Sequence, residues 1–320
     1  MRIEILASLS ALVVACSSNN PIVFAPEPDS GATVDASASR DGGDAGDGFT
    51  PIPVRDSGAG QNCSEAAQLV YVLSDSNELY SFRPNRREFT RIGTLRCPTT
   101  AQPNSMAIDR DAVAWVNYVT NDLFDTGGAI YRVSTADASC TSAPAIPLPQ
   151  GWYRLGMGFS TASADDVAET LFVTATGDAL TGASAGLGRI DPRSLTGMPV
   201  GAFTGALRGE NAELTGTGDG RLYGFFTTTP VQVAQIDKTS GAILNTQSLR
   251  GVETPQAWAF SFWGGDFYLY TAPSAATGRT TNVTRYRPSD GSVDAAYMTN
   301  IGFRIVGAGV STCAPIAPPP

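Results

Sequence analysis

The sequence contains no histidine and only one lysine, Lys238, among its 320 residues. Histidine is the commonest general base and the commonest metal ligand in proteins, so its absence excludes a Ser–His catalytic site and any His-based metal centre. Only 16% of residues are charged and the net charge is −9. Because nothing forms the basic stripe that nucleic acids require, we expect no nucleic-acid partner.

Other common motifs are missing as well. The cysteines show no CxxC pair, which makes a zinc site a poor interpretation. No P-loop is present, and no G-x-S-x-G elbow stands between a strand and a helix. The Gly-rich run 215–220 lies between two predicted strands, so its end is interpreted as a hairpin turn. We therefore expect no catalytic residues and favour a binding protein over an enzyme.

Long apolar runs are also lacking, and the longest, Ile5–Val14, is too short to span a bilayer as a helix. It follows Arg2 and leads into Val13-Val14-Ala15-Cys16, which resembles the lipobox of bacterial lipoproteins. The resemblance implies a signal peptide over 1–15, cleavage before Cys16, and a lipid on Cys16 that binds the membrane. Ser17 in place of Asp suggests the outer membrane. The alternative is an ordinary secretory signal with an incidental cysteine.

Residues 16–62 are rich in Ala, Gly, Ser and Pro, and the stretch after Cys16 carries seven acidic residues and two arginines. Such a segment cannot bury enough apolar surface to fold by itself. The acidic run 40–48 lacks the ligand spacing of an EF-hand, so a calcium loop is not indicated. We interpret 16–62 as an acidic tether.

From Gln68 onward, short β-branched and aromatic runs alternate with Gly, Asp, Asn and Pro turns. Four kinds of strand recur in the same order with a period of about 45 to 57 residues, which is typical of propeller blades. The expected inner strands contain small residues and cover 105–108, 155–159, 212–216 and 257–261. The fold class is therefore predicted as all-β, a β-propeller of about five four-stranded blades.

The two ends of the repeat predict how the ring closes. Three strands precede residue 104 without an inner strand, whereas Arg304–Val310 looks like an inner strand with nothing after it. Pairing this C-terminal strand with the N-terminal three closes the ring and removes exposed sheet edges. Six blades are the nearest competitor, because 161–185 is long, and a β-sandwich or irregular barrel is the other alternative.

Four cysteines follow Cys16, and an even number in an exported chain indicates two disulfides. Cys63 precedes the first strand and Cys313 follows the closing strand, so their pairing would lock the ring and stabilise it by about 4 kcal/mol. Cys97 and Cys140 would then join two neighbouring blades.

Acidic and amide side chains precede several inner strands. The repeats distantly resemble quinoprotein and lactonase-type propellers, and the lactonases hold calcium through Glu, Asn and Asp in the central channel. That resemblance implies candidate ligands at Asn104, Glu210, Asn211, Glu213 and Glu253. The competing interpretation makes them solvated loop residues. Asp191 and Asp237 are expected to cap turns.

Five aromatic residues could form a binding face or pack between blades, and packing is the commoner role. They are Trp115, Trp258, Phe262, Trp263 and Tyr268.

Three stretches carry a closer resemblance: 214–222, 257–266 and 305–313. With them, residues 63 to 313 resemble uncharacterised exported lipoproteins of the myxobacterial type. The resemblance implies location and no known activity. We expect a propeller domain over 63–314, a Pro-rich tail over 315–320, and a monomer that binds a protein or glycan ligand without a cofactor. The alternatives are a calcium-dependent lactonase-like hydrolase and a purely structural envelope protein.

Overall fold

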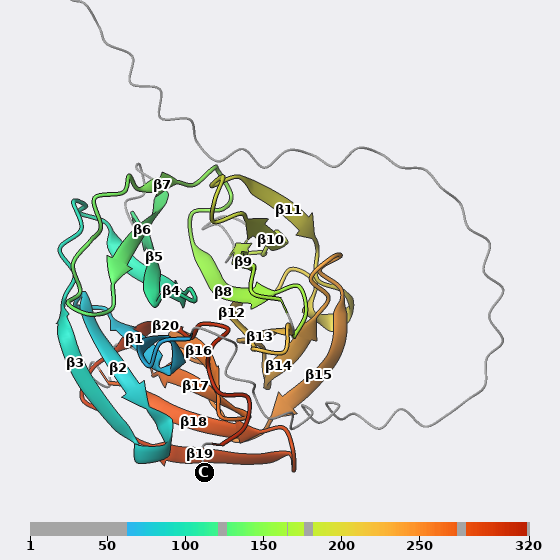
Figure 1. Ribbon diagram of the computed structural model, residues 1–320. Helices are drawn as coiled ribbons and strands as arrows, with labels where there is room; N and C mark the ends of the chain where they lie inside the picture. Colours follow the sequence, from blue (N-terminus) through green and yellow to red (C-terminus); the bar gives the residue numbers. More distant parts are fainter. Residues whose placement is uncertain (1–62, 121–126, 165, 176–181, 274–279, 319–320) are drawn as a thin grey trace, which may run out of the picture.

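The computed structural model describes residues 63–120, 127–164, 166–175, 182–273 and 280–318. They form five four-stranded antiparallel sheets arranged around a central axis as a five-bladed β-propeller (Figure 1). Helical structure in these ranges is confined to three 3₁₀ turns, η1 (Ala66–Gln68), η2 (Pro84–Arg86) and η3 (Gly205–Leu207). The predicted fold class and blade number are confirmed.

Each blade runs from an inner strand at the axis to an outer strand at the rim. Blade 1 has β20 (Ile305–Gly309), β1 (Val70–Ser74), β2 (Glu78–Arg83) and β3 (Glu88–Thr94); blade 2 has β4 (Gln102–Ile108), β5 (Val113–Val119), β6 (Gly128–Ser134) and β7 (Ile146–Pro147). Blade 3 has β8 (Leu155–Thr161), β9 (Glu169–Ala175), β10 (Gly186–Ile190) and β11 (Gly197–Gly201). Blade 4 has β12 (Ala212–Gly216), β13 (Leu222–Phe226), β14 (Val231–Ile236) and β15 (Ile243–Leu249); blade 5 has β16 (Ala257–Trp263), β17 (Asp266–Ala272), β18 (Asn282–Arg287) and β19 (Ser292–Met298).

The ring closes within blade 1, as predicted. Strand β20 pairs antiparallel with β1 and places Tyr71 opposite Gly309. Cys63 and Cys313 form a disulfide with a Cα–Cα distance of 5.8 Å beside this pair. The second disulfide, Cys97–Cys140, joins blades 1 and 2. Closure gives β1 a strand partner on both sides, so its edge is not left open for pairing with another chain.

Small residues on the inner strands allow neighbouring blades to touch through their backbones. A Cβ atom added to Gly156 would lie 2.1 Å from the carbonyl oxygen of Ala212, and one added to Gly216 would lie 1.9 Å from that of Phe159. Only glycine permits so close an approach, because any side chain would overlap the facing backbone. The crowding at the axis expected from the sequence is thus present between blades 3 and 4.

The core lies between the blades, where the two faces of each inner and second strand are covered by the neighbouring sheets. Strand β1 is buried at all five positions, and so are β8, β12 and β13 along their whole lengths. The outer strands β3, β15 and β19 are mostly half-buried or exposed. The long stretch 161–185 does not contain an additional blade: its described part consists of a loop and β9.

Two polar side chains connect different blades near the axis. Glu213 on β12 is 3% exposed, and Ser105 on β4 donates a 2.8 Å hydrogen bond to its Oε2. Burial raises the pKa of the Glu213 carboxyl well above its usual range. Lys238, in the turn after β14, donates hydrogen bonds to the carbonyl oxygens of Thr161 and Gly220, which joins blades 3 and 4.

The propeller has two faces, which we name by their connections. The turn face carries the turns from inner to second strands and from third to outer strands; the loop face carries the connections between blades and the loops from second to third strands. Both described chain ends lie on the turn face near the axis. There, Ser311 Oγ donates a hydrogen bond to the carbonyl oxygen of Ala67, and the backbone amide of Gly264 donates one to the carbonyl oxygen of Pro315.

The C-terminal segment expected as a Pro-rich tail packs against the propeller in its described part. Ile316 is buried within the cluster formed by blades 4 and 5. Among the described residues, no helix is both long and apolar enough to cross a membrane.

Candidate functional site

A cleft of about 950 Å³ opens between blades 2 and 3 on the turn face. Its walls come from the β4–β5 turn, the segment leading into β9, and the β10–β11 hairpin. The lining residues used below are Asp109, Arg110, Glu169, Arg189, Arg193 and Met198. The volume falls within the range of small-molecule sites.

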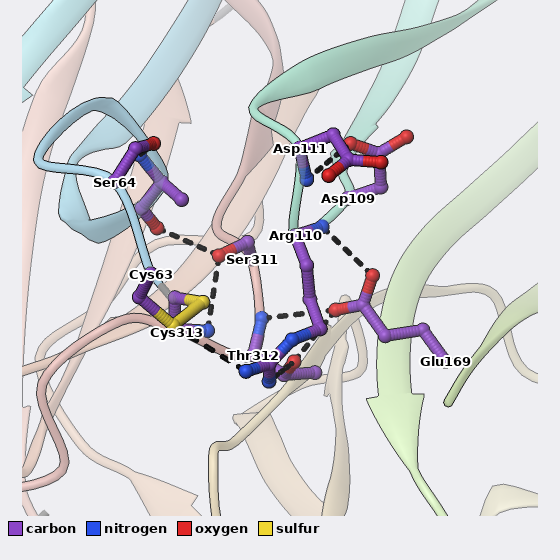
Figure 2. The surroundings of a disulfide bond; sticks show 10 residues. Cys63, Ser64, Asp109, Arg110, Asp111, Glu169, Ser311, Thr312 and Cys313 are labelled. Atoms are coloured by element: carbon purple, nitrogen blue, oxygen red, sulfur yellow. Dashed lines mark hydrogen bonds between the residues drawn. A yellow bond between two sulfur atoms is a disulfide. The ribbon is translucent and has the colours of Figure 1, made fainter. Parts of the chain in front are cut away.

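Glu169 lies at the start of β9 and reaches toward two other blades (Figure 2). Its Oε2 accepts a 2.8 Å hydrogen bond from the backbone amide of Arg110, and its Oε1 accepts one of 2.6 Å from Thr312 Oγ1. Arg110 follows β4 and Thr312 follows β20, so this carboxyl ties blades 1, 2 and 3 together at the inner end of the cleft. Both of its oxygens are consequently occupied by protein donors.

Burial raises the pKa of the Glu169 carboxyl to about 7, and the neighbouring Asp109 carboxylate adds to the shift. Burial also raises the pKa of Asp109 itself. The hydrogen bonds from Trp115 Nε1 and the amides of Asp111 and Val113 oppose that rise and occupy both oxygens of Asp109. These hydrogen bonds hold both carboxyls in fixed positions within the protein.

The Arg110 side chain points to the ring closure rather than into open solvent (Figure 2). One terminal nitrogen donates to Thr312 Oγ1 at 3.0 Å and the other donates to Cys63 Sγ at 3.4 Å. The cleft thus adjoins the disulfide that joins the two ends of the domain.

Two arginines on the outer wall are differently placed. The side chains of Arg189 and Arg193 are exposed, and neither guanidinium has a hydrogen bond with the residues that the structure describes. The charge of Arg193 is close enough to Asp191 to contribute to the lowered pKa of that carboxyl, after the hydrogen bonds from the amides of Arg193 and Ser194. Asp191 caps the β10–β11 turn, as predicted, because its Oδ1 accepts hydrogen bonds from the backbone amides of Arg193 and Ser194. Asp237 caps the β14–β15 turn in the same way.

Apolar side chains complete the outer wall. Val167 is 65% exposed and Met198 is 37% exposed, and both are among the few large apolar side chains on the described surface. Met198 lies opposite Arg189 in the β10–β11 register. Both side chains border the cleft and are open to solvent.

The residues predicted as calcium ligands lie on the opposite, loop face or at the axis. Asn104 Oδ1 accepts a 2.8 Å hydrogen bond from the Arg154 guanidinium, so a cationic side chain already occupies its oxygen. Glu210 and Asn211 directly precede β12, and Glu253 is exposed in the loop before β16. Glu213 points across the axis to Ser105. In the described ranges, no three Cys, Asp or Glu side chains gather closely enough to hold a metal ion.

The predicted aromatic residues mostly pack inside the propeller. Trp115, Phe262, Trp263 and Tyr268 are buried, and the Trp115 ring lies edge-on to Phe159. The predicted lipidation site, Cys16, lies outside the described residues. Sequence reasoning missed Glu169 and the two cleft arginines. Their only sequence signal is an acid that starts a second strand and arginines that flank a turn, and neither is distinctive.

No family model matches the chain, and no matching sequence was found among curated proteins. Two solved structures show a partial likeness to the chain. One is a gluconolactonase from Xanthomonas campestris, with a TM-score of 0.39 and 14% identity over 63% of this chain and 68% of that one. The other is a protein of unknown function from Bacteroides caccae, with a TM-score of 0.38 and 13% identity over 76% of this chain and 98% of that one. Neither likeness, at this level, indicates a function.

Proposed function

We propose that this protein is a lipid-tethered envelope protein whose propeller binds a ligand in the cleft between blades 2 and 3. The observation that carries the binding role is the contrast within the cleft. Its half-buried carboxyls, Asp109 and Glu169, accept hydrogen bonds from protein donors, whereas its outer wall presents exposed guanidiniums and exposed apolar side chains beside the exposed Asp111. Such a surface can recognise a ligand through charge and apolar contact.

Two features support the exported location. Both disulfides form in the described structure, and disulfides persist in compartments outside the cytoplasm. The signal-like start and Val13-Val14-Ala15-Cys16 supply the proposed anchor. The lipid on Cys16 and the outer membrane as its destination are part of the proposal.

Binding in the cleft is tested by filling it. Ala168 is exposed and lines the cleft, so Ala168→Trp would occupy it, and Ala206→Trp in η3 is the matched control on the other face. The thermal midpoint is measured against a panel of acidic, neutral and basic peptides and oligosaccharides. We expect at least one class to raise the midpoint of the parent and of Ala206→Trp, because a ligand that binds only the folded state stabilises it. Ala168→Trp should not respond.

The binding role is wrong if no panel member raises the midpoint, or if the ligand raises the midpoint of Ala168→Trp as much as that of the parent.

The anchor is tested by growing a bacterial host that expresses the full chain on an alkyne-tagged fatty acid. The parent and a Ser17→Ala control should carry the tag and sediment with membranes, because several acyl chains hold a protein stably. Cys16→Ser should carry no tag and remain in the soluble fraction. A tagged Cys16→Ser protein, or an untagged parent, would refute the anchor.

A further inference from the structure

The Cys63–Cys313 disulfide has a charged side chain against one of its two sulfurs. The Arg110 guanidinium donates a 3.4 Å hydrogen bond to Cys63 Sγ, and a second hydrogen bond of 3.0 Å to Thr312 Oγ1 fixes its position (Figure 2). On the other side of the bond, the backbone amide of Cys313 donates a hydrogen bond to the neutral hydroxyl of Ser311. The two sulfurs therefore lie in different electrostatic surroundings.

This difference matters for thiol–disulfide exchange, in which a thiolate attacks one sulfur and the other sulfur departs as a thiolate. A neighbouring arginine stabilises a cysteine thiolate, and the sulfur that forms the more stable thiolate leaves faster. Attack at Cys313 Sγ places the departing charge on Cys63, beside the guanidinium. Attack at Cys63 Sγ would place that charge on Cys313 instead, so the contacts favour attack at Cys313.

The acidic residues nearby do not contact the disulfide. Figure 2 shows the side chains of Asp109 and Asp111 pointing away from it. Glu169 is connected to it through Thr312, whose Oγ1 donates a hydrogen bond to the carboxyl. Burial raises the pKa of Glu169 to about 7, so a large share of this carboxyl is uncharged near neutral pH. Of the charged groups in this network, Arg110 is the one that contacts a sulfur.

The second disulfide offers a comparison within the same chain. All four cysteines are half-buried, so burial does not separate the two bonds. Within the described ranges, no side chain donates a hydrogen bond to the sulfur of Cys97 or Cys140. The guanidinium contact is thus the feature that distinguishes Cys63–Cys313.

We propose that Cys63–Cys313 is a site of thiol–disulfide exchange with a dithiol, in which Cys313 is the sulfur attacked and Arg110 stabilises Cys63 as the leaving thiolate. A thiolate of the dithiol forms a bond to Cys313 Sγ as the Cys63–Cys313 bond breaks, and the electron pair of that bond goes to Cys63 Sγ. The second thiolate of the dithiol then attacks the mixed disulfide and releases Cys313. The dithiol is oxidised to a disulfide, the two cysteines are reduced by two electrons, and the two protons of the dithiol pass to the cysteines or to water.

The exchange removes the covalent link across the ring closure, while the backbone pairing of β20 with β1 remains. It acts at the inner end of the cleft, where Thr312 contacts Glu169. The inference does not depend on a ligand in the cleft.

The rate of opening tests the role of Arg110. The folded full chain is treated with limiting dithiothreitol, quenched with N-ethylmaleimide at intervals, and digested for mass spectrometry, which identifies the bond that has opened. We expect Cys63–Cys313 to open before Cys97–Cys140, and Arg110→Gln to slow its opening about threefold or more, because the leaving thiolate loses its stabilising charge. Arg208→Gln, at an exposed arginine on the other face, should change neither rate.

The direction of this effect separates the proposal from a purely structural contact. If Arg110 only held the ring closure together, Arg110→Gln would loosen it and make Cys63–Cys313 open faster. Faster or unchanged opening in Arg110→Gln would overturn the proposal, and so would opening of Cys97–Cys140 first.

A second measurement uses the parent alone, so it does not depend on the folding of a variant. Glutathione at high concentration, followed by an acid quench, yields the mixed disulfide, and its position is read by mass spectrometry. We expect the adduct mainly on Cys313, with Cys63 left as the free thiol. An adduct mainly on Cys63, or one divided equally between the two cysteines, would overturn the proposal.

Discussion

At the scale of single residues, Glu169 connects segments that lie far apart in the sequence, since its partner Thr312 is 143 residues away. It receives donors from Arg110 and Thr312 while sitting on β9 itself, so three blades meet at one carboxyl. Its pKa of about 7, against an ordinary value of 4.5, makes this junction sensitive to pH. Between those two values the folded state retains a proton that the unfolded chain loses, so the free energy of unfolding falls as pH rises.

We therefore expect Glu169→Gln to flatten the decrease in stability between about pH 4.5 and 7. The neutral side chain can still accept a hydrogen bond from the backbone amide of Arg110. It has no charged form, so the free-energy cost of burying a charge is absent at every pH. Allowing for its partial exposure, the difference across this window should be on the order of 2 kcal/mol. Urea unfolding at several pH values measures it, with Glu88→Gln on the exposed strand β3 as control. Equal slopes for the parent and Glu169→Gln would contradict the assignment.

Residue-level reasoning from sequence could not find this junction. Arg110 and Thr312 are 202 residues apart, and their meeting depends on the blades being packed into a ring. For the candidate calcium ligands, the sequence suggested a site that the assembled blades do not form. Asn104 has the right chemistry at the start of an inner strand, but Arg154 and Asn117 occupy its polar atoms once blades 2 and 3 are assembled.

At the scale of strands and blades, the sequence was informative because every blade repeats the same order of strands. All four predicted inner strands lie within β4, β8, β12 and β16, and the closing strand corresponds to β20. The outer strands were harder to define, since they are exposed and carry little apolar periodicity. Strand β7 is the extreme case, with only Ile146 and Pro147 paired to β6.

The cleft itself could not be predicted from these elements. It depends on the β10–β11 hairpin standing beside the β4–β5 turn of another blade, and turn residues such as Asp109 and Asp191 look alike in every repeat. Which turns flank an open space is decided by blade packing, which a strand pattern does not encode.

At the scale of the whole molecule, the fold depends on joining its two ends, and the disulfides make this measurable. Cys63–Cys313 spans 250 residues, whereas Cys97–Cys140 spans 43. In the chain-entropy model, these loops correspond to about 5.5 and about 4 kcal/mol of stabilisation. The longer cross-link also holds the junction made by Arg110 and Thr312.

We expect the Cys63→Ser/Cys313→Ser double variant to lose more stability than Cys97→Ser/Cys140→Ser, by about 1 kcal/mol or more. Denaturant unfolding measures the difference. Hydrogen exchange should also show faster opening of β20 and β1 in the first variant only, because that pair closes the ring. A larger loss in the second variant, or unchanged protection of β20, would argue against ring closure as the main contribution of Cys63–Cys313.

The position of Lys238 has a practical consequence for chemical labelling. The sequence has no other lysine, and this ammonium is bonded to oxygens of Thr161, Gly220 and Ser160 at the seam between two blades. The one lysine side chain that an amine-acylating reagent can modify is therefore held in a contact between two blades. The rate of Lys238 acylation would measure how often the contact between blades 3 and 4 opens, without a signal from any other lysine.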